Sequence, residues 1–200
     1  MAHAISKYFS LLKKWNRSIR LVSAAESEDE FREKHVRDVE ELLPFLAGTN
    51  TMIDIGTGAG LPGILIKIAR PEIEVVLLDS IRKKISFCDE AIRSLGLTGI
   101  RAVVGRAEDE GVRSDLGTFD AVISRATWNL ANYVKISSCY MDRGRGSRLI
   151  ALKGALWREE LADAKNTIDK QGLTLDNAHE YTLSDGLKRC ILSFKRRCKS

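Results

Sequence analysis

The chain has 200 residues, enough for one domain that buries roughly 70% of the surface of its unfolded form. It is 44% hydrophobic and 30% charged, and no apolar stretch approaches the roughly 20 residues of a membrane span, so we expect a globular protein. Its four cysteines form no C-x-x-C pair, which favours reduced thiols in the cytoplasm over a disulfide framework or a metal site.

Two helices are expected before residue 49. Apolar residues recur at helical spacing over residues 4–20, a segment with several basic residues and no acidic one. Ser27 and Glu30 fit a capping box, and a second apolar stripe runs over 31–46 until Gly48 ends it. The net charge is +5, and the run Lys195–Lys199 makes the C-terminal end basic as well. Basic ends on a balanced chain indicate either a polyanionic partner or an ordinary solvated surface.

Strands and helices alternate after these two helices. Several expected strands, such as 75–78, are continuously apolar, as in a parallel sheet covered on both faces. The last two strands follow each other without a helix, which predicts an antiparallel hairpin. The strands are expected at 51–55, 74–79, 100–104, 119–124, 148–153, 174–182 and 188–195, and the helices between them at 61–70, 82–95, 128–141 and 157–171.

A glycine-rich loop follows the first expected strand. Asp54 precedes Gly56, Gly58 and Gly60, which occupy alternate positions. A dinucleotide fingerprint needs glycine at the sixth position, where this chain has Leu61, and this argues against a nicotinamide-dependent oxidoreductase. The D/E-x-G-x-G-x-G spacing resembles the cofactor loop of class I S-adenosylmethionine (SAM) methyltransferases.

Polar residues follow the other expected strands, where open α/β sheets bind their ligands. Asp79, directly after the second strand, could accept hydrogen bonds from both hydroxyls of a ribose or could simply begin a helix. Arg125, after the fourth strand, could hold a cofactor carboxylate or a nucleic-acid phosphate, or form a structural ion pair.

Taken together, five segments resemble the RsmG family, also called GidB, whose members methylate N7 of a guanine in bacterial 16S ribosomal RNA (rRNA). They are Asp54–Gly63, Leu78–Ser80, Gly105–Glu108, Ser124–Ala126 and Ala151–Gly154. The resemblance implies an α/β, Rossmann-like class I methyltransferase fold: a seven-stranded, mostly parallel sheet with an antiparallel C-terminal hairpin and an N-terminal helical extension. Residues 1–48 would form the extension and pack on a methyltransferase domain at 49–200.

The glycine loop and the resemblance together predict the site. SAM is the expected cofactor, and no metal is expected. The partner would be 16S rRNA or the small-subunit particle, with no membrane involved. The cofactor residues would be Asp54, Gly56, Thr57, Gly58, Gly60, Leu61, Asp79, Ala107, Glu108 and Arg125, and the RNA contacts Arg106, Arg189, His35 and Lys153.

No residue is assigned as a general acid or base. Guanine N7 is a lone-pair nitrogen without a proton, so catalysis would rest on orientation, with Arg125 as the orienting residue. The chain has Arg20–Ser23 where the family commonly has Asn-Leu-Thr, which concerns substrate handling more than cofactor binding. Two other functions remain open: a methyltransferase for a small metabolite, and a non-enzymatic RNA-binding module.

Overall fold

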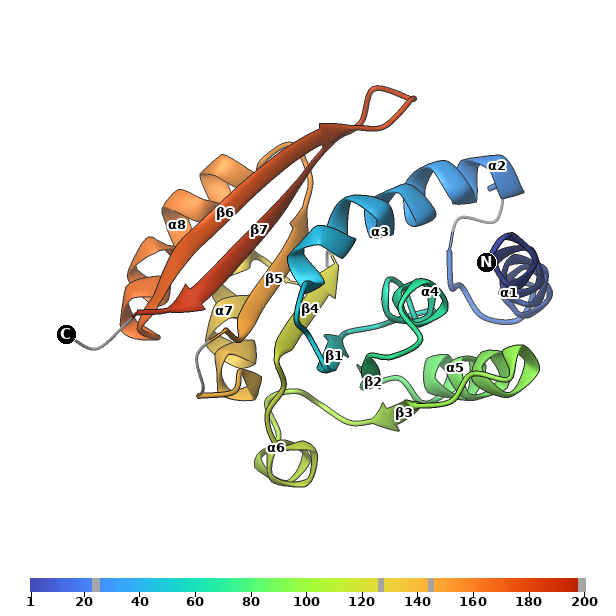
Figure 1. Ribbon diagram of the computed structural model, residues 1–200, viewed down its shortest axis with the longest axis horizontal. Helices are drawn as coiled ribbons and strands as arrows, with labels where there is room; N and C mark the ends of the chain where they lie inside the picture. The colour runs from blue at the N-terminus through green and yellow to red at the C-terminus, as the bar shows by residue number, and fades with distance from the viewer. Residues whose placement is uncertain (23–25, 126–127, 144–145, 198–200) are drawn as a thin grey trace. The chain divides into compact units, whose positions relative to one another are not determined.

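The structure is a computed structural model that describes residues 1–22, 26–125, 128–143 and 146–197 (Figure 1). The chain divides into two compact units, Met1–Arg106 and Ala107–Ser200. Parts of three sequence predictions lie outside the described residues: Ser23 of the altered N-terminal string, Ala126 of the Ser-Arg-Ala string, and Cys198 and Lys199 of the basic tail.

The first unit begins with helices that bury an apolar stripe. Helix α1 spans Ala2–Asn16 and buries Ile5, Tyr8, Phe9 and Leu12, as its helical spacing predicts. The capping box at Ser27 is confirmed, because its side chain accepts from the Glu30 N–H while the Glu30 side chain accepts from the Ser27 N–H. The second predicted helix forms as four consecutive helical segments. They are α2 (Glu28–Phe31), the π-helix η1 (Arg32–Val36), α3 (Arg37–Leu42) and the 3-10 helix η2 (Leu43–Leu46).

Three parallel strands follow with the predicted boundaries: β1 (Thr51–Ile55), β2 (Glu74–Asp79) and β3 (Ile100–Val104). Strand β2 pairs with β1 and with β3. Helix α4 (Gly63–Ala69) follows the glycine loop, and α5 (Arg82–Leu95) follows β2. Helix α1 contacts both α4 and α5, so the N-terminal helix packs on the strand-and-helix part of its own unit (Figure 1).

The second unit contains four strands. They are β4 (Ala121–Arg125), β5 (Arg148–Lys153), β6 (Leu173–Thr182) and β7 (Lys188–Arg196). Strand β5 pairs parallel with β4 and antiparallel with β7, and β6 and β7 form the predicted antiparallel hairpin, with a register shift between Leu175 and Asn177. Strand β4 begins two residues later than predicted and includes Arg125, which was expected just beyond it.

Helices complete the second unit. Helices α7 (Leu130–Ser137) and α8 (Trp157–Lys170) pack against each other beside β5 and β6, and the short 3-10 helix η3 (Ser138–Tyr140) extends α7 (Figure 1). Helix α6 (Glu110–Leu116) was not predicted; Asp109 caps it by accepting from the Gly111 and Val112 N–H groups. Within the described ranges, no helix is long and apolar enough to cross a membrane.

Candidate functional site

The carboxyl ends of the three strands of the first unit lie at one edge. The strand register places Ile55 beside Leu78 and Asp79 beside Val104. The backbone continues this alignment, because the Gly56 and Thr57 N–H groups donate to the Leu78 carbonyl and the Gly105 N–H donates to the Asp79 carbonyl. The glycine loop, Asp79 and the turn at Gly105 therefore meet at the edge where open α/β sheets bind their ligands.

The glycine loop needs its glycines for backbone conformation. Gly56, Gly58 and Gly60 have φ of 71°, 59° and 80°, a left-handed region that residues with a Cβ rarely adopt. A Cβ at Gly60 would also overlap the side chain of Ile64. The alternate glycines of the sequence therefore mark the three positions at which the loop backbone has a positive φ angle.

Asp54 binds both ends of this loop through hydrogen bonds. Its carboxylate is completely buried, and Oδ2 accepts from the Thr57 hydroxyl at 2.6 Å and from the Gly63 N–H at 3.0 Å. A Cβ at Gly63 would lie 2.9 Å from this oxygen and would overlap Leu77. The structure therefore gives Asp54 and Thr57 a role in fixing the two ends of the loop, and the direct cofactor contact that the sequence suggested for them stays a prediction. Gly63, which the sequence analysis did not assign to the site, is needed for the close approach.

Asp79 serves the loop and remains available for a ligand. Its Oδ2 accepts from the Gly58 N–H at 3.0 Å, and its Oδ1 accepts from the Ile81 N–H at 2.9 Å. Each of these oxygens can accept a further hydrogen bond. The Lys84 ammonium lies 3.8 Å from Oδ2 and helps to hold the charge of this nearly buried carboxylate. Asp79 thus binds the backbone before α5, as one sequence interpretation expected, and its role toward a ribose stays a prediction.

Two side chains that the sequence did not assign bind the carbonyls of the glycine loop. The Tyr8 hydroxyl, buried on α1, donates to the Ala59 carbonyl, and the Cys88 thiol on α5 lies 3.6 Å from the Gly58 carbonyl. Burial raises the pKa of Cys88 well above its usual range, with Asp54 and Asp79 adding to the effect, so the thiol keeps its proton and acts as a donor. The N-terminal helix thereby fixes the backbone of the loop.

We expect Tyr8→Phe to weaken SAM binding without unfolding the protein. The substitution leaves the ring in its packing against Phe31 and Phe87 but removes the hydrogen bond to Ala59. The loss of one buried bond predicts about 1 kcal/mol lower stability and a severalfold higher dissociation constant, measured by denaturant titration and by calorimetry. Tyr181→Phe, which removes a hydroxyl from the hairpin strand β6, is the matched control. Equal SAM affinity in both variants would refute this role for Tyr8.

Three predicted basic residues lie at one edge of the second unit. The register pairs Arg125 with Leu152 and Lys153 with Cys190, so the ends of β4 and β5 meet the start of β7. Arg189 precedes Cys190 and pairs with Tyr181 of β6. The strand pairing therefore brings Arg125, Lys153 and Arg189 to the same edge.

The structure revises the role of Lys153. Its side chain is nearly buried, and its ammonium donates to the Trp128 carbonyl at 2.6 Å and to Glu160 Oε2 at 2.8 Å. The same carboxylate oxygen accepts from the Leu130 N–H at the start of α7. Lys153 thus anchors Trp128 and the start of α7, and its assignment as an RNA contact stays a prediction. A cavity of about 330 Å³ lies here, lined by Trp128, Asn129, Leu152, Lys153, Gly154 and Glu160.

The remaining predicted residues differ in exposure. Ala107 is buried, and its carbonyl accepts from the Tyr140 hydroxyl at 3.1 Å, whereas Glu108 and Arg106 are exposed. His35 is partly buried on η1, where its Nε2 lies 3.3 Å from Glu26 Oε2 and its ring lies 4.9 Å from that of Phe31. These contacts agree better with a histidine held in the helix packing than with a substrate contact.

Glu26, the partner of His35, is held in its charged form. Its burial alone would raise the pKa, but the hydrogen bond and the charge of His35, together with Lys34, hold that pKa below its usual value. Separately, over the described ranges, no group of three or more His, Cys, Asp or Glu side chains is placed to hold a metal ion.

The parallel strands, the antiparallel C-terminal hairpin, the glycine loop and the acidic residue after β2 are those of a class I methyltransferase fold. The O-methyltransferase from Bacillus cereus in complex with SAH, 16% identical, has this fold with a TM-score of 0.65; the match covers 96% of this chain and 91% of that one. The predicted fold class is therefore confirmed.

The chain belongs to the family described as GidB, rRNA small subunit methyltransferase G, whose model matches residues 1–186. The "Ribosomal RNA small subunit methyltransferase G" of Nitrosospira multiformis is 41% identical over 197 residues, covering 95% of this chain and 86% of that protein. The protein of the same name from Clostridium novyi is 37% identical over 194 residues, covering 95% and 79%. The resemblance found in the five sequence segments is thereby confirmed.

Proposed function

We propose that the protein transfers the methyl group of SAM to N7 of a guanine in 16S rRNA, in the bacterial cytoplasm. Family membership over residues 1–186 carries this proposal. The glycine loop of the first unit supports it, because its backbone and the neighbouring carboxylate suit a nucleoside cofactor.

In this proposal the first unit binds most of the cofactor. Gly56, Gly58 and Gly60 let the backbone approach SAM, and Asp79 accepts hydrogen bonds from its ribose hydroxyls. Leu61 packs against the cofactor, while Asp54 and Thr57 keep the loop in shape. Ala107 and Glu108 stay candidate contacts for the adenine ring, as the family resemblance implies.

The target nucleotide is proposed to bind at the basic edge of the second unit. Arg125 and Arg189 lie there, and the cavity beside Trp128 offers an aromatic surface on which a base extruded from the RNA could stack. Arg106 is exposed and free to contact phosphate. The basic helix α1, within the proposed extension at residues 1–48, would add further RNA contacts, whereas His35 would serve the packing of the extension.

The chemistry asks little of the side chains. The N7 lone pair attacks the methyl carbon of SAM while the carbon–sulfur bond breaks and its electrons return to sulfur. Positive charge passes from the sulfonium to the guanine ring, so no proton moves. Holding N7 in line with the methyl–sulfur bond can contribute about 7–11 kcal/mol by orientation alone. Arg125 is proposed to provide this orientation, by holding either the cofactor tail or the target nucleotide.

Incubation with methyl-labelled SAM and 16S rRNA transcripts tests the proposal. We expect label in the RNA, recovered as N7-methylguanosine after nuclease digestion. A matched transcript made with 7-deazaguanosine lacks the acceptor nitrogen and should take up none. Equal label in both transcripts would show that the methyl group is accepted by an atom other than N7. Label found only in added metabolites would indicate a small-molecule methyltransferase, and RNA binding without transfer would indicate an RNA-binding module.

A further inference from the structure

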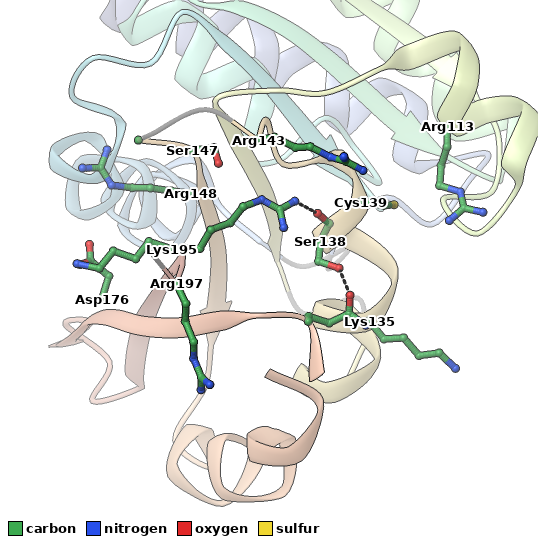
Figure 2. Close-up of a pocket in the computed structure, with 13 residues that line it drawn as sticks. Arg113, Lys135, Ser138, Cys139, Arg143, Ser147, Arg148, Asp176, Lys195 and Arg197 are labelled. Atoms are coloured by element: carbon green, nitrogen blue, oxygen red, sulfur yellow. Dashed lines mark hydrogen bonds and ion pairs between the residues drawn. The ribbon is translucent and has the colours of Figure 1, made fainter. Parts of the chain in front are cut away.

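A large basic cavity lies at the opposite edge of the second unit from Arg125 and Lys153. It is formed where β5 begins, where β7 ends and beside η3, and its volume is about 1280 Å³ (Figure 2). The strand register explains the location, because Leu149 pairs with Phe194 and Leu173 pairs with Arg196. Arg148 and Lys153 are five positions apart on β5, which places the cavity roughly 17 Å from the basic edge described above.

Cations dominate the lining of this cavity. Among the described residues that line it, seven are lysine or arginine and one, Asp176, is acidic. Ion pairs at the lining include Lys195 with Asp176 at 2.7 Å, Arg113 at 3.9 Å from Glu110, and Arg197 with Asp169. Lys135, Arg143 and Arg196 add positive charge beyond these pairs.

Arg196 fixes one wall of the cavity through hydrogen bonds to uncharged groups. Its guanidinium donates to the carbonyls of Ser138 at 2.9 Å, Met141 at 3.2 Å and Asp142 at 3.4 Å, all neutral acceptors. It thereby ties the end of β7 to η3 and to the turn before β5. The wall is therefore preorganised, and a ligand would not have to order it.

Lys135 and Arg143 add exposed positive charge to the lining. Both side chains are exposed, and neither has an ion pair with any residue in the described ranges. In Figure 2 the Lys135 and Arg197 side chains extend away from each other, and Arg148 and Arg143 lie on different sides of the cavity. Cations spread in this way suit successive phosphates of a chain better than a single small anion.

We propose that this cavity binds the phosphate backbone of the substrate RNA, at a distance from the nucleotide that is methylated. The inference rests on the proposed function for its substrate, and it adds a second contact surface. Backbone contacts of this kind fix the position of an RNA without reading its sequence. They would add affinity for long RNA and not for a short fragment that reaches only the basic edge at Arg125.

The double variant Lys135→Gln/Arg143→Gln tests the proposal in the full chain. We expect KM for 16S rRNA to rise about 10- to 30-fold at 0.1 M salt, with kcat and SAM affinity unchanged. The slope of log affinity against log salt should fall by roughly 1.4 to 1.8, the value for two lost phosphate contacts. Asp176→Asn should shift RNA affinity in the opposite direction, because it removes the acidic lining residue.

The variant Arg101→Gln/Lys165→Gln is the matched control. It removes the same two residue types from exposed sites on β3 and α8, away from the cavity lining, and should leave KM within about twofold. Equal changes in both double variants, or no change in either, would overturn the proposal. Weaker binding to small-subunit particles with unchanged binding to naked RNA would also overturn it, by assigning the cavity to a ribosomal protein. Methyl transfer by the unmodified protein is scored separately, so failure of the proposed function is distinguishable.

Discussion

Replacing Asp79 by alanine is expected to raise the dissociation constant for SAM about 100-fold. The carboxylate would accept two ribose hydroxyls, and hydrogen bonds to a charged group contribute about 1.5–3 kcal/mol each. The substitution also leaves the Gly58 N–H without its 3.0 Å acceptor, which loosens the turn that the cofactor contacts. Isothermal calorimetry with SAM and with S-adenosylhomocysteine measures the effect.

Asp89→Ala is the matched control for this prediction. Asp89 lies on α5, ten residues beyond Asp79, and its side chain is exposed. We expect its cofactor affinity to stay within about twofold of the unmodified protein, as for a typical surface substitution. Unchanged SAM affinity in the Asp79 variant would show that this carboxylate does not bind the ribose and serves only its contacts with the backbone.

Asp54→Ala is expected to produce the largest loss of stability, about 2–4 kcal/mol. The side chain is completely buried, and its removal leaves the Thr57 hydroxyl and the Gly63 N–H without the acceptor that both share. Denaturant titration followed by circular dichroism measures the free energy of unfolding. Because the loop loses both of its tethers, SAM affinity should fall as well, even at temperatures where the variant is folded.

The exposed Asp115 on α6 provides the comparison, and Asp115→Ala should change stability by less than about 0.5 kcal/mol. A stable Asp54 variant with weakened SAM binding would show that the carboxylate acts on the cofactor and not on the loop. That result would restore the direct contact that the sequence suggested.

Much of the fold could be predicted from local patterns. Strands β1, β2 and β3 have the predicted boundaries because each is a short run ended by a glycine or an acidic residue. Helix α6 escaped prediction because it is short, contains two glycines with the one that ends it, and buries none of its residues. Without an apolar stripe, only the cap at Asp109 indicates it. The division at residue 48 stays a prediction.

The parts of the candidate site that depend on contacts between distant residues could not be predicted from the sequence. The glycine spacing could be read directly, since it reflects the backbone of one loop. The hydrogen bond from Tyr8 to Ala59 joins residues 51 apart, and nothing in the local sequence distinguishes that tyrosine from its apolar neighbours. The burial of Lys153 depends on Glu160 of α8 and the Trp128 carbonyl, so a lysine after a strand looked exposed when it was not.

The basic cavity could not be predicted for the same reason. Its cations come from α6, α7, β5, β7 and the turn before β5, segments that are spread over more than 80 residues. The sequence indicated a basic C-terminal end but offered an ordinary solvated surface as an equal explanation. Only the strand register brings Arg148 and Arg196 to one edge and gives the charge a place to act.

The central claim is that this chain methylates N7 of a guanine in 16S rRNA. Mapping N7-methylguanosine by chemical cleavage in 16S rRNA from cells with and without the gene tests it most directly. We predict one cleavage site that disappears without the gene and returns when the unmodified protein is supplied, but not when the Asp79→Ala variant is. An identical N7-methylguanosine pattern in both cell lines would contradict the account.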